Sequence, residues 1–213
     1  MESNFVNITR RYGGRSKWAD IARQIAAGND GFITVGDEIK FQLKNGVDVV
    51  VQAVAVDAYA KNSVVFAFKD CPERYVMNDE ATNRGGWEAC KMRRYMNGEF
   101  LELLPDDLKS VIKLRTIKQK LGDRVVTTQD MLWAMSRKEI FGQDWETDID
   151  DVQFEWFKDR HNRIKFHNGE PAYWWERSPY YNIDYYFCFV GTGGSANYYS
   201  AYYSYGVAPA FMV

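Results

Sequence analysis

The sequence predicts an α+β fold with short antiparallel strands, two main helices and long connections. Short β-rich runs recur along the chain, helical periodicity is confined to a few stretches, and no internal repeat is visible. Strands mixed with few helices indicate α+β packing rather than alternating βαβ units. The chain has 213 residues, of which 46% are hydrophobic, so it is long enough to bury a substantial core.

The first half combines helices with a meander of strands. Residues 16–27 carry apolar side chains at helical spacing, with Ser16 as a cap and Gly28-Asn29 as the end. Asn45-Gly46 is typical of a hairpin turn. We expect one or two strands in 32–43, further strands in 47–56 and 63–68, and a helix over 87–96 that ends at Asn97-Gly98.

The second half is predicted to alternate short elements with loops. We expect a helical turn at 106–111, strands at 113–120 and 131–135, a helix at 137–141 capped by Ser136, an acidic loop at 143–151 and a helix or helical turn at 154–166. Strands are expected at 173–178, 187–190 and 207–213, whereas 198–205 is polar and aromatic without helical periodicity. We divide the chain into an N-terminal extension, 1–30, for attachment or oligomerisation, and a domain, 31–213.

Composition excludes several functional classes. The net charge is -2 and the pI is about 5.8, which argues against nucleic-acid binding. No apolar run approaches the roughly 18 residues that a membrane span needs, and no signal-peptide core is visible. We therefore expect a cytoplasmic or phage-virion protein with no membrane span.

Residues that could carry catalysis or bind a metal are few, and we expect no enzyme activity and no cofactor. Three cysteines, Cys71, Cys90 and Cys188, lack metal-site spacing. The acidic residues between 144 and 151 do not match a calcium loop, so we expect a solvated loop. His161 lies within a basic segment, 158–165, and His167 follows it, and we expect this segment to be a solvated helix face. Gly191-Thr192-Gly193-Gly194 has no phosphate-loop signature.

Tyrosines cluster near the end of the chain. Ten of the 14 lie between Tyr173 and Tyr205. Residues 180–205 contain no Lys, Glu, Gln, Trp or Met, although the rest of the chain would predict about six such residues in a window of this length. Every residue type in the window can arise from the asparagine codon AAC when only its two adenines are changed. Adenine-directed mutagenesis of this kind is characteristic of diversity-generating retroelements.

The flanks of this window carry a family resemblance. Trp174-Trp175-Glu176-Arg177-Ser178-Pro179 precedes it and Gly206-Val207-Ala208-Pro209-Ala210-Phe211 follows it. The pattern resembles variable proteins of diversity-generating retroelements, in particular an uncharacterised domain family of gut bacteria and their phages that ends in WWLRSP and GVAPAF. Glu176 stands where that pattern has an aliphatic residue. The clear match covers 174–213, and a looser one extends back to Trp87.

The resemblance implies a C-type lectin fold, related to formylglycine-generating enzymes, that displays a variable ligand-binding region at about 180–205. Tyr, Ser, Gly and Asn are also the residues that dominate antibody paratopes. The exposed, diversified positions that we predict are Tyr180, Tyr181, Asn182, Tyr185, Tyr186, Phe189, Gly191, Gly193, Asn197, Tyr198, Tyr199, Ser200, Tyr202, Tyr203 and Tyr205, with Ile183 and Asp184 left open. The scaffold beneath them is predicted to comprise Trp174, Trp175, Arg177, Phe187, Cys188 and Phe211, with Arg177 holding carbonyls of the variable loops.

Two other interpretations stay open at this stage. The tyrosines could pack as an ordinary strand ladder, although adjacent pairs such as Tyr198-Tyr199 cannot both face one core. An enzyme on the related fold is the second alternative. The expected partner is an unidentified protein or surface ligand of a host or target cell, and the chain could also form a homo-oligomer.

Overall fold

The computed structural model describes residues 18–143 and 147–213, and it confirms the α+β class. Four small sheets make up the β structure, and almost every strand pair is antiparallel. The first contains β1 (Glu38–Gln42), β2 (Asp48–Val56), β3 (Val64–Phe68) and β14 (Ala210–Met212). The second contains β12 (Ala196–Ser200), β11 (Tyr186–Val190), β10 (Trp174–Pro179), β13 (Ser204–Val207) and β4 (Glu73–Val76), in that order.

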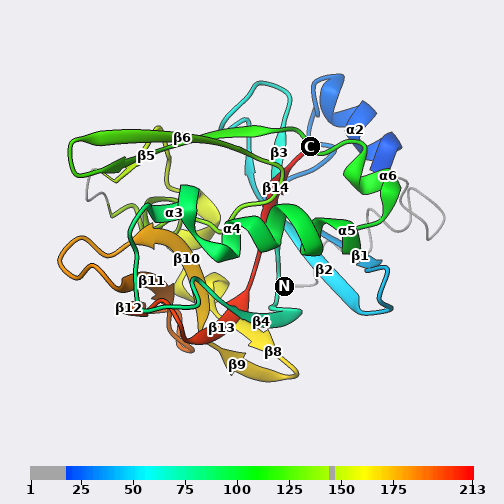
Figure 1. Ribbon diagram of the computed structural model, residues 1–213. Coiled ribbons are helices and arrows are strands. Elements are labelled where there is room, and N and C mark those ends of the chain that lie inside the picture. Colours follow the sequence, from blue (N-terminus) through cyan, green and yellow to red (C-terminus); the bar gives the residue numbers. More distant parts are fainter. Residues whose placement is uncertain (1–17, 144–146) are drawn as a thin grey trace.

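Two smaller sheets and several short helices complete the fold (Figure 1). β5 (Arg115–Leu121) and β6 (Arg124–Asp130) form a long hairpin that β7 (Asp148–Ile149) joins, and β8 (Lys165–His167) pairs with β9 (Glu170–Ala172). The α-helices are α2 (Trp18–Ala26), α3 (Gly86–Ala89), α4 (Lys91–Tyr95), α5 (Leu101–Leu103), α6 (Asp106–Lys109) and α7 (Arg137–Phe141). A π-helical turn, Met96–Phe100, links α4 to α5, and two 3-10 turns, Glu155–Lys158 and Arg160–Arg163, stand where a helix or helical turn was expected.

Asn97 explains two differences from the predicted elements. The helix was expected to end at Asn97-Gly98 but continues to Leu103, because the half-buried Asn97 side chain donates to the Arg93 and Leu132 carbonyls. Its Oδ1 accepts the N–H groups of Met131 and Leu132. Residues 132–135 are buried and Met131 is half-buried, and they form only an isolated bridge, between Trp133 and Ala210, instead of the predicted strand, since a side chain satisfies part of their backbone.

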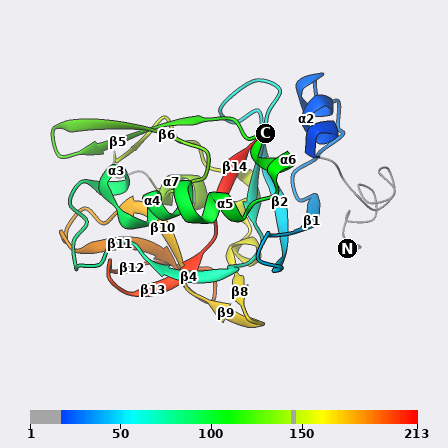
Figure 2. The ribbon, with the colours of Figure 1, turned by 45° about the vertical axis from the view of Figure 1, so that its right-hand side comes forward.

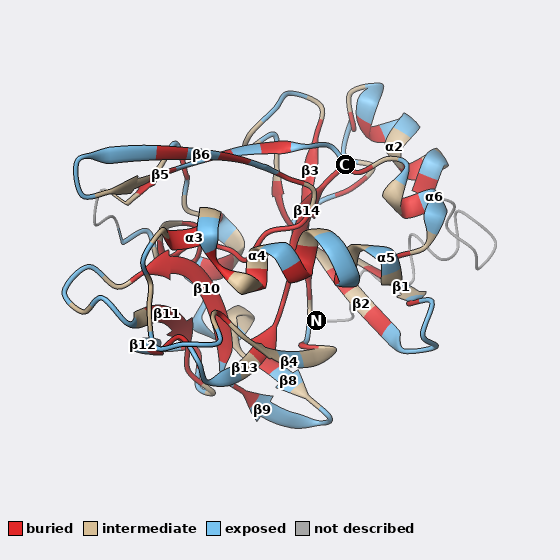
Figure 3. Cartoon of the chain, in the orientation of Figure 1, coloured by how far each residue is buried: buried red, intermediate tan, exposed pale blue. Residues whose placement is uncertain are grey.

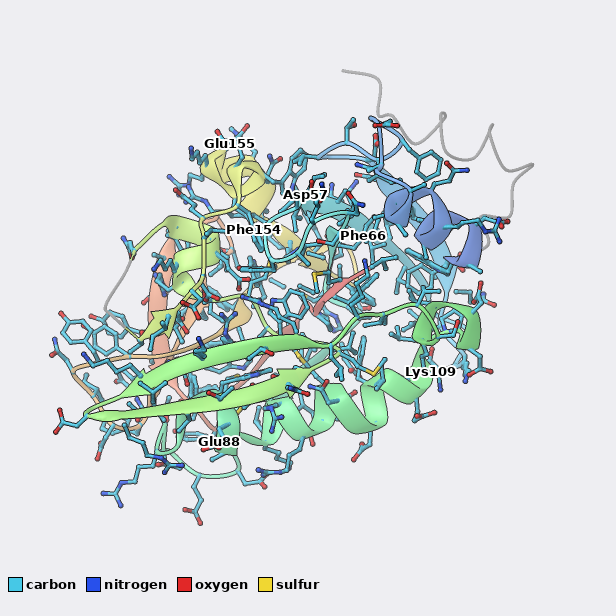
Figure 4. The ribbon with its side chains drawn as sticks, turned by 90° about the horizontal axis from the view of Figure 1, so that it is seen from above. Asp57, Phe66, Glu88, Lys109, Phe154 and Glu155 are labelled. Atoms are coloured by element: carbon cyan, nitrogen blue, oxygen red, sulfur yellow. The ribbon has the colours of Figure 1, made fainter. Side chains whose placement is uncertain are left out.

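One hydrophobic core runs through the described residues and includes α2. Trp18, Ile21 and Ile25 are buried, and the Trp18 ring makes edge contacts with Phe66 and Phe211. The boundary proposed at residue 30 stays a prediction, but α2 is packed against the domain that follows it. Figure 4 shows Phe66 and Phe154 among the packed side chains and Glu155 at the periphery.

The two ends of the molecule carry different parts of the chain. In both ribbon views, α2 lies at one end, whereas β11, β12 and the loop before β11 lie at the other (Figures 1 and 2). Figure 3 shows β10 and β11 in red because they are buried, whereas the loop between them is pale blue. The second sheet therefore presents a buried centre and an exposed end.

Candidate functional site

The candidate site is built on the end of the second sheet. β11 pairs with β10 on one side and with β12 on the other, so that Cys188 faces Tyr198 and Phe187 faces Tyr199. β10 also pairs with β13 in parallel, at Trp174 and Gly206. The whole 180–205 segment is thereby folded back on itself beside the buried β10.

Ring contacts join all ten tyrosines between Tyr173 and Tyr205 into one network, which we call the tyrosine surface. Five rings form a near-parallel series with interplanar angles of 16–30° between neighbours, in the order Tyr180, Tyr198, Tyr186, Tyr199 and Tyr205. The closest pair, Tyr180 and Tyr198, has ring centroids 3.8 Å apart. The other five contact this series or each other: Tyr181, Tyr185, Tyr203, Tyr202 and Tyr173.

Most of the tyrosine surface is open to solvent. Seven of its ten residues are 38–60% exposed, including Tyr198, Tyr199, Tyr202 and Tyr203. The purely structural interpretation needed these four to be buried, and they are not. Tyr180, Tyr186 and Tyr205 are half-buried within the ring series, and burial raises the pKa of Tyr205 to about 12. Asn182, Gly193 and Asn197, also predicted as display positions, are exposed.

Three predicted display positions are buried instead, and the prediction is wrong for them. Phe189 is only 4% exposed because its ring lies against Trp175, Tyr173 and Tyr205. Gly191 sits in a tight turn in which an added Cβ would lie 2.8 Å from Ser195 Oγ. Ser200 is buried at the end of β12, where its carbonyl accepts from Tyr203.

The predicted scaffold residues all lie in the interior. Trp174, Trp175, Phe187, Cys188, Arg177 and Phe211 are at most 1% exposed. Both tryptophans use their indole N–H, Trp174 toward the Arg163 carbonyl at 2.9 Å and Trp175 toward the Tyr75 carbonyl at 3.1 Å. The indole N–H of a buried Trp usually has such a partner, and these two bonds fix β10 against its neighbours.

Arg177 does not hold carbonyls of the variable loops, as was predicted. It lies in a buried ionic cluster in which it pairs with Glu139 at 2.5 Å and with Asp151, while Arg115 pairs with the same two carboxylates at 2.7 and 2.5 Å. Its remaining polar contacts include the Ala134 carbonyl, outside the variable segment. Two guanidiniums with two carboxylates between them are a compact arrangement of opposite charges, although the Nε atoms of both arginines make no hydrogen bond.

The ionic cluster also corrects the predicted acidic loop. Asp148 and Asp151 are 3% and 4% exposed rather than solvated, because Ser178 and Ser136 donate to their carboxylates beside the arginines. Asp150 is exposed and pairs with Lys118, whereas Asp144 and Glu146 lie outside the described residues. Among the described residues, no group of His, Cys, Asp or Glu side chains could hold a metal ion.

Glu176 forms a second buried pair next to the variable strands. Its carboxylate lies 2.7 Å from Arg137 Nε, and both side chains are at most 3% exposed. Burial raises the pKa of Glu176 to about 7, although the charge of Arg137 acts to lower it. The thiol of Cys188, near this pair, stays protonated, because burial raises its pKa well above its usual value. Where the family pattern has an aliphatic residue, this chain thus has Glu176 together with a buried arginine that pairs with it.

Three side chains from outside the variable segment bond to its main chain, and none was predicted from the sequence. Asn83 donates to the carbonyls of Tyr180, Ile183 and Tyr186, at 3.1, 2.9 and 2.8 Å. Arg137 donates to the Asn197 carbonyl at 2.5 Å and Arg160 to the Gly193 carbonyl at 2.6 Å. No local signal marks such long-range bonds, because they join residues 33–103 positions apart.

The cysteines and the basic segment offer little chemistry in this structure. All three cysteines are free and buried, and burial raises the pKa of Cys71 and Cys90 to about 12. A nucleophilic thiol needs the opposite shift of its pKa.

Lys165, predicted to be solvated, is buried, because its ammonium bonds to the carbonyls of Phe68 and Lys69 and lies 5.0 Å from the Trp174 ring.

A pocket of about 410 Å³ borders the tyrosine surface. Tyr180 and Tyr181 line it together with Asn83, Arg84 and residues of the β5–β6 hairpin. Arg84 is exposed and lies 3.9 Å from Asp184. The tyrosine surface thus ends in a hollow with a mixed polar and apolar lining at this border.

Comparison with known proteins gives the family. The family described as a domain of unknown function (DUF6273) matches residues 54–213, which is most of the chain, so the chain belongs to this family. No curated protein and no solved structure matches the chain. Within the described residues, no helix combines the length and the apolar character that a membrane span requires.

Proposed function

We propose that this member of the DUF6273 family is a non-enzymatic binding protein, acting in adhesion or receptor recognition. Its tyrosine surface contacts the partner, and a diversity-generating retroelement varies the displayed residues within 180–205. The observation that carries this proposal is the connected set of ten tyrosines, seven of them exposed, on one end of a buried sheet. Large patches of exposed aromatic side chains on a monomer mark interaction sites.

The proposal includes a C-type lectin fold for the domain. It is supported by the motif resemblance in residues 174–179 and 206–211 and is compatible with the short antiparallel strands and long connections described above. Both motifs lie in the buried part of the second sheet or in its continuation toward β14. They flank the segment that is displayed, as a constant frame around a variable region requires.

The arrangement of the rings favours a protein partner. Tyr198 has a neighbouring ring on both sides, Tyr180 and Tyr186, and Tyr199 lies between Tyr186 and Tyr205. Tyr180 covers one face of the Tyr198 ring at 3.8 Å, and the other neighbours, at 5.8–6.4 Å, cover these faces only in part. Ring edges and hydroxyls are therefore a large share of what is left for the partner. Sugar rings stack on open aromatic faces, whereas edges and hydroxyls suit the mixed polar and apolar surface of a polypeptide.

The size of the tyrosine surface is sufficient for specific binding. A few buried aromatic side chains typically contribute about 2 kcal/mol or more each to an interface. Tyrosine also loses little conformational entropy on binding, and the rings here are already ordered by one another. Affinities from micromolar to nanomolar are within reach of such a patch.

A comparison of the gene with its surrounding DNA tests the diversification. We expect a reverse-transcriptase gene and a near-identical repeat, with mismatches confined to adenines of the repeat. The mismatches should fall in codons for exposed residues such as Tyr181, Tyr185, Tyr202 and Tyr203 and spare those for buried Phe187 and Val190. The equally long stretch 148–173 serves as the control. Mismatches spread evenly over both stretches, or the lack of any repeat, would contradict the proposal.

Binding itself can be tested on intact cells. Fluorescently labelled protein is added to intact gut bacteria, the cells that the family resemblance implies, before and after treatment of the cells with protease or with periodate. We expect protease to abolish binding, periodate to leave it, and the Tyr202→Ser/Tyr203→Ser variant to bind at least about tenfold less. Loss after periodate alone would identify a glycan instead of a protein.

A further inference from the structure

We propose that Asn83 and Arg137 are positioning residues that fix the main chain of segment 180–205, so that its conformation does not depend on the side chains it displays. This inference rests on the proposed function, since a diversified segment must keep its shape while its side chains change. It concerns residues outside the diversified window. Its basis is the type of atom that each of these two side chains contacts.

The Asn83 side chain bonds to several main-chain carbonyls of the loop between β10 and β11. Its Nδ2 lies within 3.1 Å of the carbonyl oxygens of Tyr180, Ile183 and Tyr186, and its main-chain N–H donates to Asp184 at 2.7 Å. All four acceptors are main-chain carbonyls. Every residue type offers the same main-chain carbonyl at these positions, so replacement of a displayed tyrosine leaves these acceptors in place.

Arg137 plays the same role for β12. Its Nη2 donates to the Asn197 carbonyl, and its Nε is held by Glu176 at 2.7 Å, while the guanidinium lies 4.9 Å from the Phe141 ring. Arg137 is 2% exposed, so its position is fixed by the core rather than by solvent-exposed neighbours. The partner atom in the variable segment is again a carbonyl oxygen.

The turn before β12 is held in a similar way, although at the surface. Arg160 donates to the Gly193 carbonyl at 2.6 Å. Gly194 has a φ of +74°, and an added Cβ would lie 2.6 Å from the Arg160 carbonyl. Glycine is therefore required at 194 by both backbone conformation and space, which makes this position a constant one inside the window.

The displayed side chains contact neighbours within the segment. Tyr202 and Tyr203 contact one another at 4.6 Å, and the side chain of Asn197 accepts from the neighbouring Tyr198 N–H. The segment thus combines constant main-chain bonds, made by Asn83 and Arg137, with side-chain contacts that can be exchanged.

Hydrogen–deuterium exchange of the full chain tests the inference. The display variant Tyr181→Ser/Tyr185→Ser/Tyr202→Ser/Tyr203→Ser is compared with Asn83→Ala and with Asn83→Asp, which keeps the size but replaces the amide donor. The readout is exchange of the Tyr180 and Tyr186 amides, which donate to Tyr186 and Ile183 carbonyls, with β1–β2 amides as the internal control. We expect about tenfold faster exchange in both Asn83 variants, and less than about twofold change in the display variant.

Arg137→Lys gives an independent measurement. It should accelerate exchange in β12 and leave the loop around Asn83 unchanged, because lysine loses the planar fork that reaches Glu176 and Asn197 together. If Asn83→Ala does not fold while the display variant does, the inference stands. Faster exchange in the display variant than in the Asn83 variants, or unchanged exchange in all Asn83 and Arg137 variants, would overturn it. The gene comparison decides the proposed function separately, since it does not depend on these amides.

Discussion

Beside α7, Glu176, Arg177 and Ser178 each bond to a particular side chain, whereas on the tyrosine surface the rings contact mainly one another. In the interior, substitution of one residue leaves another side chain without its bonding partner. On the tyrosine surface, the main chain is held by Asn83 and Arg137, and the side chains add contacts that are not needed to keep it in place. One sheet can therefore require particular side chains in its interior and tolerate different side chains at its surface, when its outer segment is held through main-chain carbonyl groups.

Arg177→Met should have the largest effect on stability. The substitution leaves Glu139 and Asp151 buried with Arg115 as their remaining guanidinium partner, and breaking a buried ion pair from one side costs about 3–5 kcal/mol. Urea unfolding measures the change in the free energy of unfolding. Lys118→Met is the matched control, because Lys118 pairs with Asp150 at the surface and should cost less than about 1 kcal/mol. Equal losses in the two variants would show that the interior is no more specific than the surface.

Glu176→Gln should change how stability depends on pH. Because burial raises the pKa of Glu176 from 4.5 to about 7, the folded protein binds more protons than the unfolded chain between these values. The stabilisation is therefore complete below about pH 4.5 and is lost as the pH rises through 7, by about 2–3 kcal/mol between pH 5 and pH 8.

The variant should lose that share of the pH dependence, while glutamine keeps the size of the side chain beside Arg137. Urea unfolding at pH 5 and pH 8 measures it. Burial raises the pKa of Asp151 as well, so some dependence of the same sign should remain in Glu176→Gln. Identical pH profiles for the variant and the unchanged protein would contradict the shift at Glu176.

Patterns along the chain predicted the elements whose cause is local. The helix at 137–141 begins at Ser136 as expected, because Ser136 and Glu139 form a reciprocal cap, and the hairpin at Asn45-Gly46 joins β1 to β2, with Gly46 at a φ of +87°. β4 and β6 were not predicted, because their polar residues give no alternating apolar signal.

In the candidate site too, local sequence patterns predicted some features and missed those that depend on tertiary contacts. Clustering of tyrosines along the chain indicated the segment, and the structure exposes seven of the ten. The burial of Phe189 and Ser200, the ionic cluster at Arg177 and the bonds of Asn83 depend on which distant segments meet. Local sequence patterns could not predict these contacts, since tertiary packing decides which distant segments lie together.

Tyr202→Ser/Tyr203→Ser should have the smallest effect on stability of all these changes. Both residues are exposed, at 47% and 38%, and substitutions at such positions usually change the free energy of unfolding by less than about 0.5 kcal/mol each. Tyr95→Ser is the matched control, because the Tyr95 ring is buried, stacks on Tyr75 at 4.1 Å and donates its hydroxyl to Glu73. We expect that control to lose about 3–5 kcal/mol in urea unfolding. A loss of similar size in the double variant would mean that the tyrosine surface also holds the fold together, and the permissive outer segment inferred above would then be wrong.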